Sequence, residues 1–219
     1  MEAEDIRVKL RGNEVLPIGM RGTSYEMVIQ LFEKGVLTGD PTESKRRGGT
    51  YIYIWPIREN WEAYGLSPPA PWGKNYWDPV RSSKDFAIIH TRHDHFEREC
   101  GFPIGEYERW LNNYEDIRRK IKSAMTERGL TDSDIAKLIK ETKMRKGYIL
   151  EFHPDLARDY ALSPDDWFGK DYSVAFQVDC PNGVGIKYVS KIKPIGKFDE
   201  ELMKKYLRER KVHESRALQ

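Results

Sequence analysis

The sequence predicts a mixed α+β domain rather than a doubly wound parallel sheet. Strand and helix patterns occur in the order β-α-β, then a helical block, then a region rich in strands, with no internal repeat. Regular alternation of strands and helices along the whole chain would instead favour a parallel sheet. The 219 residues suit a single domain, residues 1–219, with a helical insertion at about 105–146. Residues 211–219 carry no periodic pattern, so we expect a frayed tail there.

Composition excludes several classes of protein. With 39% hydrophobic and 12% aromatic residues, the chain can build a core and is too apolar to be disordered. Its mean hydropathy is −0.72, and no apolar run approaches the roughly 18 residues of a membrane span, so we expect no membrane partner. The acidic start Met1–Asp5 lacks the basic and apolar parts of a signal peptide. Because Cys100 and Cys180 offer no disulfide framework, we expect a reduced, cytoplasmic protein. The high content of Lys, Arg and Glu, together with few cysteines, is a thermophile-like composition.

Two short strands and a helix are predicted at the start of the chain. Apolar and polar residues alternate in Ile6–Leu10, and Glu14–Met20 offers a second strand that leads into a turn at 21–24. Thr23 or Ser24 can cap the following helix, and Gly35 can end it. The apolar stripe of that helix consists of Met27, Val28, Leu31 and Phe32.

The clearest strand of the sequence is Thr50–Trp55, which is β-branched or aromatic throughout. A short helix is expected within Ile57–Tyr64. Residues 66–79 combine four prolines with several aromatic residues. This long loop is either a lid or stacking platform, or a segment held by buried tryptophans. Lys84–His90 is expected to resume as a strand.

The second half of the chain begins with helices and ends in a strand-rich region. Gly129 interrupts the helical block, and residues 131–134 supply the cap of its next helix. The elements expected after this block are strands at Tyr148–Phe152, Ser173–Val178 and Gly185–Ile195, a helix within Pro154–Leu162, and a capped helix at Asp199–Arg210.

Basic runs allow a nucleic-acid partner. The formal net charge is only +2, but positive residues gather at 45–47, 118–122 and 204–211. Such runs attract phosphate groups, and residues 125–136 are similar to the opening of a helix-turn-helix. A non-enzymatic nucleic-acid-binding protein is therefore one alternative function. The same features also fit solvated faces of a charge-rich protein and a helical insertion that only packs.

Three of the five histidines, His90, His93 and His95, lie within six positions. Imidazole nitrogens, together with the carboxylates of the same segment, are ligands that zinc, manganese or iron accept. On a strand, His93 and His95 would share a face, and His90 would join them only through a turn. A metal-dependent hydrolase or nuclease is therefore a second alternative, and histidines bonded to their neighbours are the structural interpretation.

The turn before the first helix has the composition of an anion site. A strand-end Arg21 beside hydroxyl groups, at a helix N-terminus, combines a guanidinium, backbone N–H groups and the helix dipole, all of which favour phosphate. Gly22 would let a ligand approach the backbone closely. Tyr51 and Tyr53 on the following strand could stack on a flat ring. The structural alternative is Arg21 in a surface ion pair and two tyrosines in the core.

Over about residues 15–64 the chain resembles the ADP-ribosyltransferase-like superfamily. The resemblance rests on Arg-Gly-Thr-Ser at 21–24, an amphipathic helix ending in Lys-Gly, and a strand reading Gly-Gly-x-Tyr-x-Tyr at 48–53. It implies two small, mostly antiparallel sheets that form a cleft for NAD or a related nucleotide. It also implies a transferase, more narrowly a glycosyltransferase, that moves ADP-ribose from NAD to a protein or nucleic-acid acceptor.

The resemblance also assigns roles to four residues near the N-terminus. Arg21 would hold the ribose and phosphates of NAD, Thr23 would contact the ribose, and Tyr51 would stack on nicotinamide. Tyr53 is a further cofactor-binding candidate. These roles fit the chemistry, because cleavage of the C–N bond passes through an oxocarbenium-like ribose and requires held phosphates and a stacked leaving base.

The third motif of the family departs in this chain. The family's catalytic glutamate often ends a Gln-x-Glu or Glu-x-Glu triplet on a late strand, whereas residues 177–179 read Gln-Val-Asp. Asp179 is one methylene shorter, which moves its carboxylate by more than an ångström. We expect Asp179, with Tyr51, to act in catalysis, and Glu151 is the alternative acid. The other interpretations of this departure are a different chemistry, or a fold that is kept for binding only.

Overall fold

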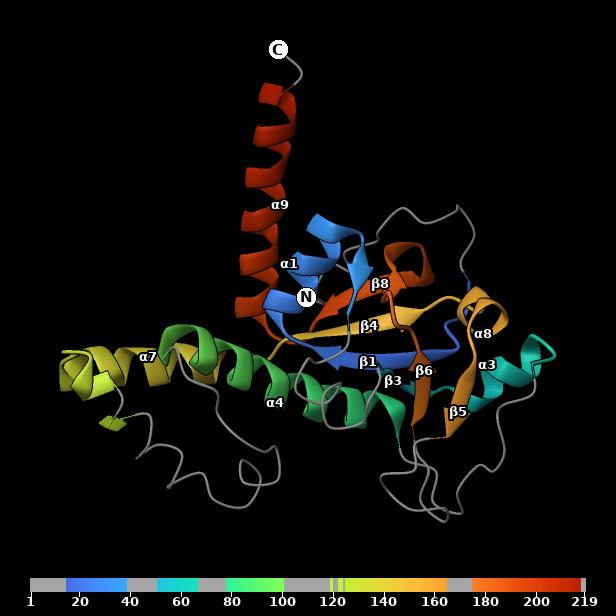
Figure 1. Cartoon of the computed structure of the whole chain (residues 1–219), viewed down its shortest axis with the longest axis horizontal. Coiled ribbons are helices and arrows are strands. Elements are labelled where there is room, and N and C mark those ends of the chain that lie inside the picture. Colours follow the sequence, from blue (N-terminus) through green and yellow to red (C-terminus); the bar gives the residue numbers. More distant parts are fainter. Residues whose placement is uncertain are drawn as a thin grey trace.

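The computed structural model describes residues 15–38, 51–66, 78–100, 119, 122–123, 125–164 and 175–217. These residues form a six-stranded sheet in the order β5-β6-β3-β1-β4-β8 and a two-stranded sheet of β2 and β7 (Figure 1). Every strand pair is antiparallel. The structure therefore confirms the mixed α+β class with antiparallel sheets. Among the described residues, no helix combines the length and apolarity that crossing a membrane requires.

Most of the expected elements are present. The strands are β1 (Gly19–Thr23), β2 (Val36–Leu37), β3 (Tyr51–Pro56), β4 (Tyr148–Phe152), β5 (Leu162–Pro164), β6 (Phe176–Asp179), β7 (Val184–Gly185) and β8 (Val189–Pro194). The helices are α1 (Tyr25–Lys34), α3 (Arg58–Ala63), α4 (Pro79–Cys100), α7 (Asp132–Met144), α8 (Asp155–Asp159) and α9 (Lys197–Ala217), with a 3-10 turn η2 (Ile186–Tyr188).

Local signals at the ends of helices are confirmed. The hydroxyl of Ser24, rather than Thr23, accepts the N–H of Met27 at 3.3 Å and caps α1. Gly35 ends the same helix with φ of 70°, a conformation that glycine adopts without strain. Thr131 and Asp134 form a reciprocal capping box at the start of α7.

The predicted strand Lys84–His90 is wrong, because these residues lie within helix α4. The helical signal is a stripe of small residues at positions i, i+4 and i+8. Ser83, Ala87 and Thr91 form this stripe, and all three are fully buried. They let α4 pack directly on β1, and this tertiary packing outweighs the short apolar run that suggested a strand.

Other boundaries also differ from expectation. Arg21–Thr23 was expected in a turn but continues β1, because β4 pairs with it as far as Thr23. The expected strand Gly185–Ile195 is interrupted by η2 before β8 begins. Helix α9 continues past Arg210 to Ala217, into the segment predicted to fray. The expected strand Ile6–Leu10, nearly all of the proline-rich loop and residues 105–118 of the helical insertion lie outside the described residues.

The core lies between one face of the large sheet and helices α1, α3, α8 and α9, and α4 covers the opposite face (Figure 1). In the same view, the C-terminal part of α9 extends beyond the sheet. The side chains that fill the core include Ile18, Leu31, Ile52, Ile54, Trp61, Tyr148, Leu150, Phe152, Leu156, Val178, Ile192 and Met203.

Two glycines allow α4 to approach the sheet. A Cβ atom at Gly22 would lie 2.0 Å from the carbonyl oxygen of Ser83 and 2.3 Å from the backbone nitrogen of Ala87. A Cβ atom at Gly147, where φ is 83°, would lie 2.3 Å from the hydroxyl of Thr91. We expected Gly22 to make room for a ligand, but the backbone that approaches it closely is that of α4.

Candidate functional site

The large sheet divides between β1 and β3. Two residue pairs join these strands, the last of them Met20 with Trp55. Beyond that pair, β1 stays paired with β4 as far as Thr23, and β3 stays paired with β6 as far as Tyr51. The strands therefore separate at the end of β1 that carries Arg21.

The Arg21 side chain bridges this division. Its Nη1 donates a hydrogen bond to the carbonyl oxygen of Tyr53 at 3.1 Å, and its Cζ lies 5.6 Å from the ring centroid of Phe86 on α4. The residue is 4% exposed, so the alternative of a surface ion pair is wrong. Tyr53 is 8% exposed and belongs to the core, as its structural interpretation predicted. A guanidinium on an aromatic face keeps its charge at low cost in a buried position.

The strand that carries Tyr51 also meets the strand that carries the expected catalytic acid. In the antiparallel pairing of β3 with β6, Tyr51 lies opposite Asp179. Asp179 is exposed, and the neighbouring Cys180 is 1% exposed. The ring of Tyr51 lies outside the described part of the structure, so its stacking role stays a prediction. Strands β1, β3 and β6 are thus consecutive in the sheet and bring the three expected motifs together.

Thr23 and the alternative acid Glu151 occupy different surroundings. Thr23 is 2% exposed and pairs with Tyr148. Glu151 lies on β4, on the side of β1 away from β3, and its carboxylate forms an ion pair with Lys193. Of the two acids, Asp179 is the one on a strand adjacent to β3.

The histidine cluster lies on α4 rather than on a strand. The ring of His90 packs against Phe86, with centroids 4.1 Å apart. His95 is 1% exposed, and its Nδ1 lies 2.8 Å from the hydroxyl oxygen of Thr142. The side chain of His93 is outside the described residues. Because a helix turns 100° per residue, His90 and His95 do not share a face. Within the described ranges, no three His, Cys, Asp or Glu side chains form a group suited to a metal ion.

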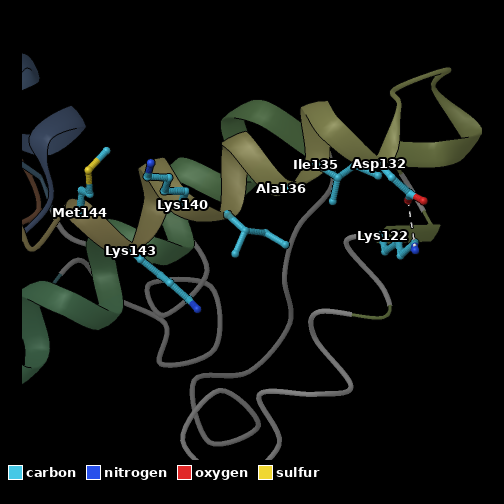
Figure 2. Close-up of a pocket in the computed structure, with 8 residues that line it drawn as sticks. Lys122, Asp132, Ile135, Ala136, Lys140, Lys143 and Met144 are labelled. Atoms are coloured by element: carbon cyan, nitrogen blue, oxygen red, sulfur yellow. Dashed lines mark ion pairs between the residues drawn. The ribbon is translucent and has the colours of Figure 1, made fainter.

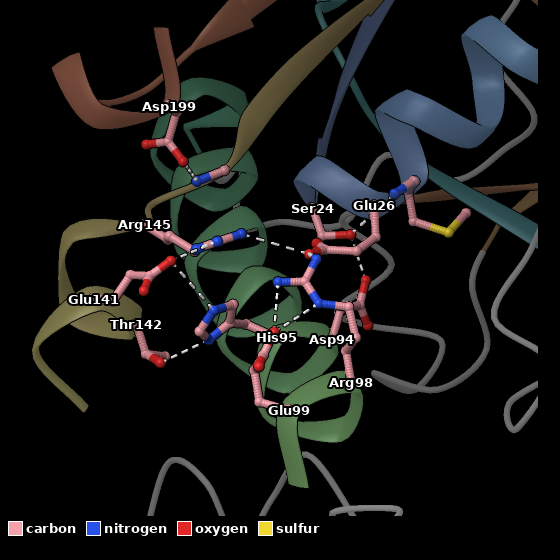
Figure 3. Close-up of polar contacts among 12 residues, drawn as sticks. Ser24, Glu26, Asp94, His95, Arg98, Glu99, Glu141, Thr142, Arg145 and Asp199 are labelled. Atoms are coloured by element: carbon pink, nitrogen blue, oxygen red, sulfur yellow. Dashed lines mark hydrogen bonds and ion pairs between the residues drawn. The ribbon is translucent and has the colours of Figure 1, made fainter. Parts of the chain in front are cut away.

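A polar network that the sequence patterns did not predict joins α1 to α4 (Figure 3). The Ser24 hydroxyl donates to the Asp94 carboxylate. On the next turn of α4, Arg98 contacts Glu26 of α1 at 2.7 Å and its neighbour Glu99 at 2.9 Å. Several opposing effects act on the pKa of Glu26, and the largest of them, burial, raises it. These contacts hold the start of α1 against the C-terminal third of α4.

The network continues into α7 through a buried arginine (Figure 3). Arg145 is 5% exposed, contacts Glu141 at 2.8 Å and lies 3.6 Å from Glu26. The hydrogen bond from Arg145 lowers the pKa of Glu141. Burial, with further contributions from Arg145 and Arg98, lowers the pKa of His95 to about 4. His95 is therefore neutral near pH 7.

Asp199, at the start of α9, extends the same network. It is fully buried, and its carboxylate accepts the backbone N–H groups of Lys146 and Gly147 at 3.0 Å each. Burial raises its pKa, although these N–H groups act in the opposite direction. Its backbone carbonyl accepts the hydroxyl of Tyr148 at 2.6 Å. Ser24, His95 and Asp199 are all nearly inaccessible to solvent, and the contacts of this network hold α1, α4, α7 and the start of α9 together.

A hollow of about 560 Å³ lies along the outer face of α7 (Figure 2). Ile135, Ile139 and Met144 contribute its apolar surface, and Lys140 and Lys143 also line it. A recognition helix would need a row of polar side chains on the face that enters a DNA groove. Four of the eight residues that line this hollow are charged, and two of these, Lys122 and Asp132, form an ion pair at 3.1 Å, so the hollow does not test the helix-turn-helix interpretation.

Comparison of the chain with protein-family models, with curated proteins and with solved structures found no match. Functional conclusions therefore depend on the residues of the chain itself.

Proposed function

We propose that this chain binds NAD, or a related nucleotide, where β1 and β3 separate, and that it transfers ADP-ribose to a protein or nucleic-acid acceptor. The observation that supports the proposal is the adjacency of β6, β3 and β1 in the sheet. These strands carry Asp179, Tyr51 and Arg21. The register of β3 with β6 places Tyr51 opposite Asp179, which is the proximity that a stacked leaving base and a catalytic carboxylate require.

Arg21 would contact the diphosphate of the nucleotide. A guanidinium has five N–H donors, so it can hold the carbonyl oxygen of Tyr53 and a phosphate oxygen at the same time. The ring of Phe86 and the bond to Tyr53 limit its rotation. A side chain that is already oriented loses less conformational entropy when it binds a ligand.

Asp179 would stabilise the ribose as positive charge develops on it. In the reaction, the bond from the ribose C1′ to the nicotinamide nitrogen breaks, and its electron pair leaves with nicotinamide. A nucleophilic oxygen, nitrogen or sulfur of the acceptor then bonds to C1′ and releases its proton to solvent. With water as acceptor, the products are nicotinamide, free ADP-ribose and a proton. A fixed carboxylate near the ribose lowers the energy of this cationic transition state.

The test is release of nicotinamide from NAD by the purified chain, with water as the acceptor. Asp179 is exposed, so Asp179→Asn should fold normally. Loss of its charge should lower turnover by roughly 100-fold or more. Asp179→Glu keeps the charge but moves it by more than an ångström, and should lower turnover by about tenfold or more.

Asp85→Asn is the matched control. Asp85 is an exposed carboxylate on α4, its side chain 67% exposed, and its loss should leave turnover unchanged. Nicotinamide release no faster than in protein-free buffer would refute the proposal. Equal turnover by the wild type and Asp179→Asn would remove Asp179 from the mechanism.

A further inference from the structure

A second hollow lies on the face of the sheet that α4 covers. It has a volume of about 300 Å³, and its walls come from β1, β4, the end of β8 and the first turns of α4. Met20, Ile149, Val80 and Ile195 supply apolar surface. A volume of about 300 Å³ is at the lower end of the range for small-molecule sites. Its apolar lining suits a short hydrocarbon body.

Among the charged side chains that line this hollow, lysines outnumber carboxylates. Glu151 is 6% exposed, and its carboxylate is paired with the ammonium of Lys193. Lys84 of α4 also lines the hollow. In the part of the chain that the structure describes, no hydrogen bond or ion pair engages the side chain of Lys84. Two ammonium groups and one carboxylate therefore give the hollow a net charge of +1 at neutral pH.

This charge selects the class of ligand. A lysine ammonium has three N–H donors, so Lys193 can hold Glu151 and a second oxyanion together. A monoanion would neutralise the hollow, whereas a phosphate dianion would leave an excess negative charge beside the buried Glu151. A cation would be repelled by the ammonium groups of the two lysines.

We propose that this hollow binds a small organic monocarboxylate. Lys84 and Lys193 contact its carboxylate, and Met20, Ile149 and Val80 contact its apolar body. This inference is independent of the proposed function, because it uses neither Arg21 nor Asp179.

The probe is hexanoate, titrated into the full chain by calorimetry at neutral pH and moderate salt. Lys84→Met keeps the length of the side chain and removes its charge, and should weaken hexanoate by about tenfold, since one charge-assisted hydrogen bond is lost. Lys140→Met is the matched control, because Lys140 is an exposed lysine on the distant hollow of α7. It should leave hexanoate binding unchanged.

Two further measurements separate the carboxylate from the hydrocarbon. Hexanol and hexylamine have the same apolar chain, and each should bind at least about tenfold more weakly than hexanoate. Val80 is 38% exposed, so Val80→Trp can fill the hollow without loss of the fold, and should abolish binding. The proposal is overturned if hexanoate does not bind, if Lys84→Met and Lys140→Met bind it equally, or if Val80→Trp retains full affinity.

Discussion

Replacing Gly22 with alanine would force helix α4 away from the sheet. The added Cβ atom would lie 2.0 Å from the Ser83 carbonyl oxygen, 2.3 Å from the Ala87 nitrogen and 2.9 Å from the Ala87 Cα. All three are backbone atoms of one helix, so no side-chain rotation can remove the clash. Raising the shortest distance from 2.0 Å to an ordinary contact of 3.4 Å requires the helix to retreat by roughly 1.4 Å.

The expected loss of stability is large because the strain outweighs the entropic benefit of alanine. Forcing extra volume into a packed interior costs about 1–3 kcal/mol, and backbone contacts on one rigid helix place Gly22→Ala at the upper end. Replacing glycine with alanine also restricts the unfolded chain, which returns about 0.4–1 kcal/mol. The net decrease in the free energy of unfolding should therefore be about 2 kcal/mol, or roughly 4–8 °C in Tm for a chain of this size.

Urea denaturation followed by circular dichroism and fluorescence measures this change. Gly185→Ala is the matched control, because the nearest atom to its added Cβ would be 3.8 Å away and its φ is −62°. That variant should keep wild-type stability to within about 1 kcal/mol and can gain from the restricted unfolded chain. If Gly22→Ala is as stable as Gly185→Ala, the close contact between α4 and β1 does not exist as described.

Three further predictions follow from the buried polar groups. The pKa of His95 falls from 6.5 to about 4 on folding, so the unfolded chain binds more protons between these values and this histidine makes the protein less stable as pH drops from about 6.5 to 4. In urea titrations at several pH values, the stability advantage of wild type over His95→Gln should therefore shrink over that range. A constant difference would contradict this prediction. Asp199→Ala leaves the buried N–H group of Gly147 and the partly buried N–H group of Lys146 without their acceptor, and it should cost about 2–3 kcal/mol. The loss is measured by denaturation against Asp85→Ala, whose effect should be negligible; equal losses would refute the role of Asp199. Burial raises the pKa of the Cys180 thiol to about 11, so in a Cys100→Ser background it should resist a thiol-reactive disulfide reagent at pH 8 until urea unfolds the chain, and rapid labelling of the native protein would show that it is accessible.

Local features of this protein were predictable from sequence because nearby residues determine them. The Ser24 cap, the Gly35 stop and the Thr131 capping box depend on side chains within a few residues of the backbone groups that they satisfy. The strand Tyr148–Phe152 was predicted with its observed bounds, since its apolar run is flanked by a glycine and a histidine-proline turn. The mixed α+β class followed from the order of such segments.

The motif residues were identified in sequence, but their arrangement was not. That Arg21 lies on a strand next to that of Tyr51, and that Asp179 lies opposite Tyr51, depends on strand order and register. Pairing between distant segments depends on how the whole chain buries its apolar faces, which no local pattern contains. The burial of Arg21 against Phe86 follows from the same assembly.

Sequence by itself therefore determined the mixed α+β class, the ends of α1 and the start of α7, the strand Tyr148–Phe152, and which side chains have the chemistry to bind an anion. Tertiary structure alone decided that residues 79–100 are a helix, because Gly22 and Gly147 create the space in which its small residues pack. It also decided that His95 and Arg145 share a network with Glu26 across three helices and their connections. Burial and charge pairing arise only when separate segments of the chain come into contact. The tertiary structure, and not the neighbouring sequence, therefore determines the surroundings of a titratable group.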